Sequence, residues 1–329
     1  MASNLDHYNR RITYLRISVT DRCNLRCIYC RPVKDLALVH HDEILRYEEI
    51  LKIIEAGVEI GITKVRLTGG EPLVRKHFVH LVESVCQVPG LKDVSITTNG
   101  VSLKRKAKEI FKAGVHRINV SLDTLSPLKY IKITGRDYFD NVWKGLEEAE
   151  AVGFSPIKVN VVAMRGVNDD ELIAFAKLSL EKPYHVRFIE YMPVGKDNPW
   201  ERQRYISSDE IKSRIEPLGP LHKISRSAQE GPAKRYRLPS AAGEIGFVTA
   251  MSHHFCPSCN RLRLTADGKL RPCLFSDDEI DIKGPLRRGC SGEDLKALFE
   301  TAIARKPKEH HATIFKTGAS KRPMSAIGG

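Results

Sequence analysis

The stretch that decides the fold is YLRISVTDRCNLRCIYC, residues 14–30. Its first half, YLRISVT, is rich in β-branched and aromatic residues and predicts a short strand. Its second half is a polar loop that places three thiols at C-x3-C-x2-C spacing, in Cys23, Cys27 and Cys30. A strand that runs directly into such a loop predicts a site at the carboxyl end of a parallel strand, where α/β barrels gather their chemistry.

The same succession of strand and helix continues along the chain. The predicted strands are residues 14–20, 64–70, 94–100, 116–123, 157–164 and 185–192. Amphipathic patterns predict helices between them, at residues 46–61, 137–153 and 169–180. Alternation of strand and helix at this spacing is typical of right-handed βαβ units and a parallel sheet. We therefore expect an α/β fold, an incomplete (β/α)6 barrel of the TIM type.

Unusual polar sequences follow each of the six predicted strands. They read TDRC, TGGEP, TTNG, SLDT, NVVAMRG and EYMP. Because the carboxyl ends of parallel strands meet at one mouth, these six loops are expected to form a single site.

The pattern changes after the sixth strand. Residues 216–236 are rich in Pro, Gly and Ser and predict a boundary. Beyond it, the short strand-like runs EIGFVTA, NRLRLTA and KLRPCLF precede a predicted helix, GEDLKALFETAIA. We expect two domains, a partial barrel over residues 1–220 and a smaller C-terminal α+β domain over residues 221–329.

The composition is that of a globular protein with a basic surplus. Lys and Arg number 53 against 40 Asp and Glu, a net charge of +13, which favours an anionic partner. The densest basic run, KRKAKEIFK at residues 104–112, is interpreted as a solvated helix face.

No run of the sequence reaches the roughly 18 apolar residues that a membrane span needs. The first residues lack the apolar core of a secretion signal, so we expect a cytoplasmic protein.

Six of the eight cysteines form two groups of three. The first trio is Cys23, Cys27 and Cys30, whose spacing suits an iron–sulfur cluster with one iron left open. A zinc site completed by a distant histidine is the alternative. Cys86 is interpreted as a buried hydrophobe, and Cys290 has no evident companion. A secreted disulfide scaffold is excluded, because such chains are short and dense in cysteine.

The second trio is Cys256, Cys259 and Cys273, spaced C-x2-C-x13-C. Taken alone, this spacing is equally compatible with zinc, with His253 or His254 as a fourth ligand.

The strand-like NRLRL beside the second trio points Arg261 and Arg263 to one face. Two guanidinium groups there suit phosphates or a purine edge, which favours a ligand site with a cluster over zinc. A surface strand with two solvated arginines is the alternative.

The first trio, with Tyr29 before its last cysteine, resembles the signature of the radical S-adenosylmethionine superfamily. That resemblance implies a [4Fe–4S] cluster whose open iron binds S-adenosylmethionine, and a 5′-deoxyadenosyl radical formed by its reductive cleavage. The GGEP sequence of residues 69–72 resembles the superfamily's contact to the methionine amino group. Glycine is expected there because it lets the backbone approach a neighbour closely.

With both trios, the chain resembles the GTP 3′,8-cyclase family over nearly its whole length. The resemblance is carried by RISVTDRCNLRCIYC, TGGEP, TTNG, SLDT, FIEYMP, FCPSCNRLRLTADGKLRPCLF and RPMSAIGG. The chain departs from the family pattern at Arg31, where Met is common, and at His77, where Asp is common.

The resemblance assigns roles position by position. It implies that the first trio holds the cluster that cleaves S-adenosylmethionine, and that the second trio holds a second [4Fe–4S] cluster which binds guanine. Positions that match contacts to S-adenosylmethionine are Tyr29, Gly70, Ser121 and Met192. Positions that match contacts to GTP are Arg16, Arg66, Thr97, Lys158, Arg187, Arg261 and Arg263. The terminal Gly328 and Gly329 would reach toward the active site, and a frayed tail is the alternative.

The implied reaction is the first step of molybdenum cofactor biosynthesis, cyclisation of GTP to (8S)-3′,8-cyclo-7,8-dihydroguanosine 5′-triphosphate. The radical would take the ribose 3′ hydrogen, and the new carbon radical would attack C8 of guanine. Implied partners are a flavodoxin- or ferredoxin-like electron donor and a downstream cyclic pyranopterin monophosphate synthase, with a homodimer left open. No membrane or nucleic-acid partner is expected, and no general acid or base can be named from the sequence.

Two other interpretations stay open. A peptide-modifying radical enzyme with an auxiliary cluster would typically carry more C-terminal cysteines than this chain. A zinc-bearing, nucleic-acid-binding protein would use NRLRL as its contact strand and bind with a steep salt dependence. The second interpretation leaves GGEP and the polar strand ends unexplained.

Overall fold

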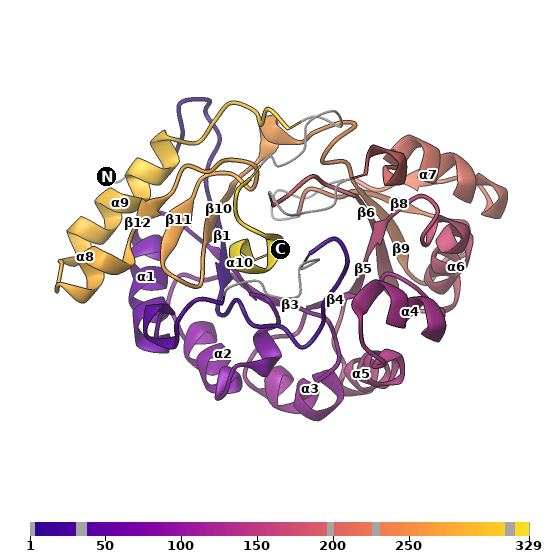
Figure 1. Ribbon diagram of the computed structural model, residues 1–329, viewed down its shortest axis with the longest axis horizontal. Helices are drawn as coiled ribbons and strands as arrows, with labels where there is room; N and C mark the ends of the chain where they lie inside the picture. Colours follow the sequence, from indigo (N-terminus) through magenta and orange to yellow (C-terminus); the bar gives the residue numbers. More distant parts are fainter. Residues whose placement is uncertain (1–3, 31–37, 196–200, 226–230, 313–319, 329) are drawn as a thin grey trace.

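The computed structural model describes residues 4–30, 38–195, 201–225, 231–312 and 320–328. Its centre is a curved sheet in which six parallel strands follow one another in chain order (Figure 1). These strands are β1 (Tyr14–Ser18), β2 (Lys64–Thr68), β3 (Asp93–Thr98), β4 (Ile118–Ser121), β5 (Ile157–Ala163) and β6 (Tyr184–Glu190). All six predicted strands are confirmed, and with them the incomplete (β/α)6 barrel.

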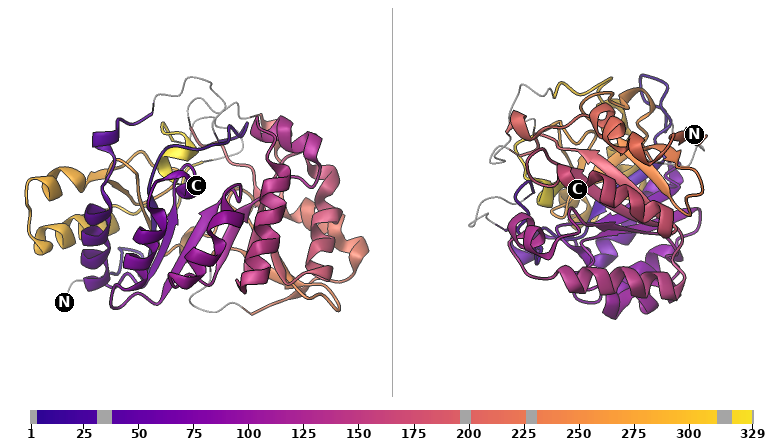
Figure 2. Two further views of the ribbon diagram at one scale, coloured as in Figure 1. Left: turned by 90° about the horizontal axis from the view of Figure 1, so that it is seen from below. Right: turned by 90° about the vertical axis from the view of Figure 1, so that its right-hand side faces the viewer.

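Helices cover the outer face of this sheet (Figure 2). They are α1 (Tyr47–Glu59), α2 (Phe78–Cys86), α3 (Leu103–Lys112), α4 (Pro127–Thr134), α5 (Phe139–Val152) and α6 (Leu172–Glu181). The helix expected at residues 169–180 begins with a 3-10 turn, Asp169–Glu171, before α6. The basic run on α3 is a solvated face as predicted: Leu103, Ala107 and Ile110 are buried, whereas Lys104, Lys108 and Lys112 are exposed.

The C-terminal segment adds strands to both edges of the same sheet. Strand β9 (Glu244–Val248) pairs in parallel with β6, and β10 (Arg261–Leu264) pairs in parallel with β1. Shorter antiparallel strands complete the twelve-stranded sheet: β7 (His222–Lys223), β8 (Lys234–Arg237), β11 (Lys269–Arg271) and β12 (Ile280–Asp281). The division at residues 220/221 therefore crosses a continuous sheet, and two separate folding units stay a prediction.

The remaining helices lie in the C-terminal half. They are α7 (Ser208–Ile215), α8 (Lys283–Arg287), α9 (Gly292–Ala304) and α10 (Met324–Ile327). Short 3-10 turns occur at His41–Glu43, Pro72–Val74, Arg202–Arg204, Glu216–Leu218 and Cys256–Ser258. Figure 1 shows α10 and the C-terminal end of the chain inside the curve of the sheet, at the mouth of the barrel.

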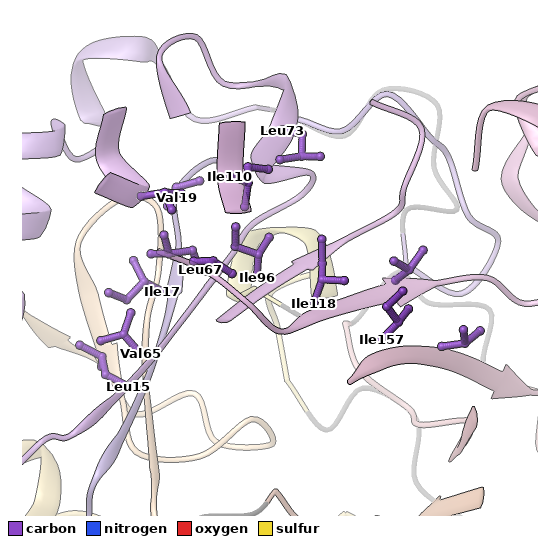
Figure 3. Packing of buried hydrophobic residues seen from close by; sticks show 14 of the residues in the cluster. Leu15, Ile17, Val19, Val65, Leu67, Leu73, Ile96, Ile110, Ile118 and Ile157 are labelled. Carbon is purple, nitrogen blue, oxygen red and sulfur yellow. The ribbon is translucent and has the colours of Figure 1, made fainter. Parts of the chain in front are cut away.

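The hydrophobic core lies between the sheet and the outer helices. Its strand residues include Leu15, Ile17, Val65, Leu67 and Ile96, all fully buried (Figure 3). Since side chains alternate along a strand, the residues between them face the interior of the barrel. Those residues are polar or charged on β1 and β2, so the sheet has one apolar face for the helices and one polar face for a ligand.

No helix in the described ranges is long and apolar enough to cross a membrane.

Candidate active site

Strand register places three arginines in one row across the barrel interior. Arg16 on β1 is in register with Arg66 on β2 and with Arg263 on β10. Each is about nine-tenths buried. The polar face of the sheet therefore gathers positive charge from segments that are far apart in the chain.

The first trio lines a cavity at the carboxyl ends of the strands, as the sequence predicts. The same cavity is lined by every residue matched to S-adenosylmethionine contacts: Tyr29, Gly70, Ser121 and Met192. Thr97, matched to GTP, also lies here. One cavity thus holds the first trio beside all four expected cosubstrate contacts.

The second trio lines a neighbouring cavity, together with Arg187, Arg261 and Arg263. The two cavities share a set of lining residues: Arg16, Arg66, Asn160, Ile189, Met192 and Met324. They therefore meet at the arginine row, with one cysteine trio on each side. The first trio follows β1, whereas Cys256 and Cys259 precede β10 and Cys273 follows β11; the pairing of β1 with β10 sets the two trios at opposite ends of these neighbouring strands.

Lys158 lies one step deeper on β5 than Asn160, in register with Asn119 and His185. It is half-buried, and burial lowers its pKa to about 6, with further lowering from Arg187 and Arg66. Lys158, matched to GTP by the sequence, is not among the residues that line the two cavities, and it is mostly neutral above pH 6.

The arginines around the point where the two cavities meet are held in an environment that disfavours their charge. Burial lowers the pKa of Arg16 to about 10 and that of Arg187 to about 9, and lowers the pKa of Arg263 well below its usual value. Neighbouring arginines contribute to each of these shifts. A polyanion bound here would relieve this repulsion, because opposite charge favours the ionised form of each group.

The loop of the first trio is fastened to the GGEP turn. Gly70 N–H donates to Thr20 O at 2.6 Å, and Glu71 N–H donates to Arg22 O at 2.8 Å. A Cβ atom on Gly70 would lie 2.4 Å from Arg22 O, so only glycine fits. Gly70 thus lets the backbone of the GGEP turn pack directly against the loop that carries the first trio.

The residues of the first trio suit an iron–sulfur cluster. Burial raises the pKa of Cys27, and the negative charges of Asp123, Cys30 and Cys23 raise it further. Three thiolates that line one cavity repel one another until positive metal ions offset their charge. The Cys23 sulfur accepts hydrogen bonds from Leu25 N–H at 3.3 Å and from Asn99 Nδ2 at 3.7 Å, an outer shell of the kind that tunes such clusters.

The second trio has a more cationic setting. Burial raises the pKa of Cys259, but Lys306 and Arg261 lower it more, to about 6. His253, one candidate zinc ligand, instead contacts Asp209 at 2.6 Å. Within the described residues, no three His, Cys, Asp or Glu side chains are arranged to hold one metal ion. His254, the other candidate zinc ligand, lines the same cavity as the three cysteines, so the choice between a cluster and zinc at the second trio stays a prediction.

The C-terminal tail enters the site. Gly328 O accepts a hydrogen bond from Arg263 Nη1 at 2.8 Å, and Met324 lines both cavities. The tail is held by Arg322, which pairs with Asp267 at 2.9 Å and with Glu279. Gly329 and Arg31 lie outside the described residues.

Sequence reasoning missed several residues of the site. Asp123 accepts from the Tyr29 hydroxyl at 2.7 Å, and burial raises its pKa to about 6. Burial likewise raises the pKa of Glu71 to about 7, although its carboxylate accepts from Asn99 N–H at 2.6 Å. The strand-end motifs SLDT, TGGEP and TTNG contain these residues, so the sequence indicated the motifs but not the roles of Asp123, Glu71 and Asn99.

Cys86 packs against the hydrophobic core as predicted, but it is partly buried and not fully buried. Burial raises its pKa to about 11, and it packs against Gly114.

Comparison with known proteins places this site in a family. Residues 17–179 match the radical SAM superfamily, and residues 184–312 match Molybdenum Cofactor Synthesis C. The GTP 3′,8-cyclase of Thermodesulfovibrio yellowstonii is 51% identical over 98% of this chain and 99% of its own length.

The chain belongs to the GTP 3′,8-cyclase family.

Other members of the GTP 3′,8-cyclase family are similarly related. The enzymes of Pelotomaculum thermopropionicum and Moorella thermoacetica are each 50% identical, over 98% of this chain and 99% of their own length. The radical SAM match contains the first trio, and the Molybdenum Cofactor Synthesis C match contains the second.

Solved structures share the fold at low identity. Streptococcus suis SuiB bound to S-adenosylmethionine has a TM-score of 0.61 at 16% identity, covering 83% of this chain and 64% of SuiB. Native anSMEcpe with bound AdoMet has a TM-score of 0.58 at 14% identity, covering 93% of this chain and 84% of that one. The cyclase family therefore shares its barrel with other radical SAM proteins.

Proposed function

We propose that this protein is a radical S-adenosylmethionine lyase that cyclises GTP to (8S)-3′,8-cyclo-7,8-dihydroguanosine 5′-triphosphate, the first step of molybdenum cofactor biosynthesis. The observation that carries the proposal is the arginine row of Arg16, Arg66 and Arg263, which lies between two cysteine-lined cavities. A triphosphate on this row would extend between the two cavities and bring its ribose close to the first. The names of the relatives, all GTP 3′,8-cyclases, support the same substrate.

The first cavity would hold the cosubstrate. The first trio would bind a [4Fe–4S] cluster, and Tyr29, Gly70, Ser121 and Met192 would contact S-adenosylmethionine there. Reductive cleavage of S-adenosylmethionine supplies the radical that removes the ribose 3′ hydrogen. The Tyr29 hydroxyl is fixed toward this cavity by its hydrogen bond to Asp123.

The second cavity would hold the nucleotide base. The second trio would bind a second [4Fe–4S] cluster near guanine, while Arg261 and Arg263 would contact the nucleotide. Thr97, Lys158, Arg187, Arg16 and Arg66 would complete the GTP site. The guanidinium groups of Arg16, Arg66 and Arg187 would act by position and charge and not as acids.

The C-terminal tail would complete the GTP site at the mouth of the barrel. Gly328 is fixed by Arg263, and Gly329 would follow it toward the nucleotide. The expected partners are a flavodoxin- or ferredoxin-like electron donor and a cyclic pyranopterin monophosphate synthase that takes the product. A cytoplasmic location and a homodimer belong to the same proposal.

Anaerobic turnover tests the proposal. Protein reconstituted with iron and sulfide is incubated with dithionite and S-adenosylmethionine, with or without GTP, and 5′-deoxyadenosine is measured by mass spectrometry. We expect GTP-dependent 5′-deoxyadenosine that carries deuterium when the GTP is deuterated at the ribose 3′ position. ATP, GDP and a short RNA run in parallel as substrate controls.

Two other results would each contradict a different part of the proposal. Cleavage that does not depend on GTP would keep the superfamily chemistry and remove GTP as substrate. Zinc in place of iron, with no cleavage, would remove the proposal altogether.

A further inference from the structure

Lys306 is a buried cation beside the second trio that follows directly after α9. It is 4% exposed and lines the same cavity as the three cysteines. Its ammonium Nζ donates to Arg261 O at 2.8 Å and to Pro272 O at 2.7 Å. Arg261 lies just after Cys259, and Pro272 lies just before Cys273. One side chain thus ties together the two arms of chain that carry the second trio.

The charge of Lys306 has no carboxylate partner in the described ranges, since both of its hydrogen bonds go to neutral carbonyls. Arg10, on the other side of the same loop, provides the contrast. Arg10 donates to Cys256 O at 2.9 Å and Pro307 O at 2.7 Å, but its charge is balanced by Asp6 at 2.6 Å. A buried charge is costly unless an opposite charge offsets it. Lys306 therefore requires an anion from within its own cavity.

The second trio can supply that anion. Lys306 lines one cavity with Cys256, Cys259 and Cys273. No Asp or Glu is among the described residues that line this cavity, so the thiolates of the trio are the anions available to the ammonium.

We propose that the Lys306 ammonium is the counter-charge of the iron–sulfur cluster held by the second trio, and that it makes this cluster easier to reduce. The inference rests on the proposed function, which supplies the cluster. Reduction adds an electron and makes the cluster more negative, and a fixed positive charge at its edge stabilises that state. The reduction potentials of such clusters follow net charge and hydrogen bonding around the sulfurs.

The test isolates the second cluster in the full chain. Cys23, Cys27 and Cys30 are replaced by Ala, so that iron, sulfide and the reduced-state EPR signal report on the second trio alone. Into this background we introduce Lys306→Met, Lys306→Arg and Lys308→Met. Lys308 is exposed and two residues away, so its variant removes the same charge outside the cavity. Iron content and the midpoint potential are measured for each protein.

We expect Lys306→Met to lower the midpoint potential, while Lys306→Arg and Lys308→Met leave it close to that of the parent. Loss of iron in Lys306→Met that Lys306→Arg restores would also support the assignment. An unchanged potential in a fully loaded Lys306→Met protein would overturn it, as would loss of iron from both Lys306 variants. Absence of iron on the second trio in the parent itself would instead count against the proposed function.

Discussion

At the scale of single residues, Lys158 differs from the arginines around it. Burial lowers its pKa to about 6, whereas the pKa of Arg187 is lowered to about 9 and that of Arg16 to about 10. Near neutral pH the charge of Lys158 therefore changes while those of Arg187 and Arg16 do not. In the free protein it is mostly neutral above pH 6.

This difference predicts proton uptake on GTP binding. A triphosphate beside Lys158 favours its charged form and raises its pKa. Binding at pH 7.5 should therefore take up a proton at Lys158, and affinity should fall as pH rises from about 6, by at most about tenfold per pH unit. Calorimetry in buffers of different ionisation enthalpy measures the protons. Lys158→Met should abolish this uptake, and a wild-type protein that binds GTP without it would contradict the prediction.

At the scale of elements, α10 and the residue after it enter the barrel mouth only because Gly328 has no side chain. Its φ is +80°, and a Cβ there would lie 3.0 Å from Thr68 Cγ2 and 3.1 Å from Ser18 Cβ. The hydrogen bond from Arg263 to Gly328 depends on this fit. The tail packs on the mouth and not into the core, so its displacement should affect the site more than stability.

Gly328→Val should therefore reduce 5′-deoxyadenosine turnover by about tenfold or more, which corresponds to about 1.4 kcal/mol of lost positioning. The melting temperature should change little. Gly289→Val is the matched control, because Gly289 also has a φ of +80° but nothing lies within 4 Å of its added Cβ. That variant should keep full turnover and bear only the backbone strain, about 1 kcal/mol. Equal turnover in the two variants would mean that the tail has no part in the reaction.

At the scale of the whole molecule, the C-terminal segment completes the barrel from both sides. Strand β10 covers the free edge of β1, and β9 covers the free edge of β6. Uncovered edges of a parallel sheet expose unpaired backbone groups and promote aggregation. The pairing of β10 with β1 also places the cavity of the second trio beside the cavity of the first.

A chain that ends at residue 220 should consequently fail to form a soluble monomer, while the full chain remains monodisperse. Size-exclusion chromatography with light scattering measures the oligomeric state, and near-ultraviolet circular dichroism measures whether the product is folded. A folded, monomeric product would instead establish residues 1–220 as an independent domain, the division that the sequence predicts.

Much of this architecture could be predicted from local patterns. The six β-branched runs and the amphipathic segments between them match β1 to β6 and their helices, because periodicity of side chains reflects which face is buried. Cysteine spacing and the polar strand ends likewise identified the two trios and the mouth of the barrel. Lys306 gave no such signal, since nothing in the sequence ARKPKEHH distinguishes it from the neighbouring Lys308.

Local sequence patterns are enough to predict the secondary-structure elements, their parallel order and the chemistry carried on each loop. The pairing of β10 with β1, which puts Arg263 in register with Arg16, and the contact of Gly328 with Arg263 follow only from the folded chain. The difference lies in how far apart in the sequence the interacting residues are. A strand's periodicity depends on its own residues, whereas its neighbour in the sheet, and the partner of a buried charge such as Lys306, depend on how distant segments pack together.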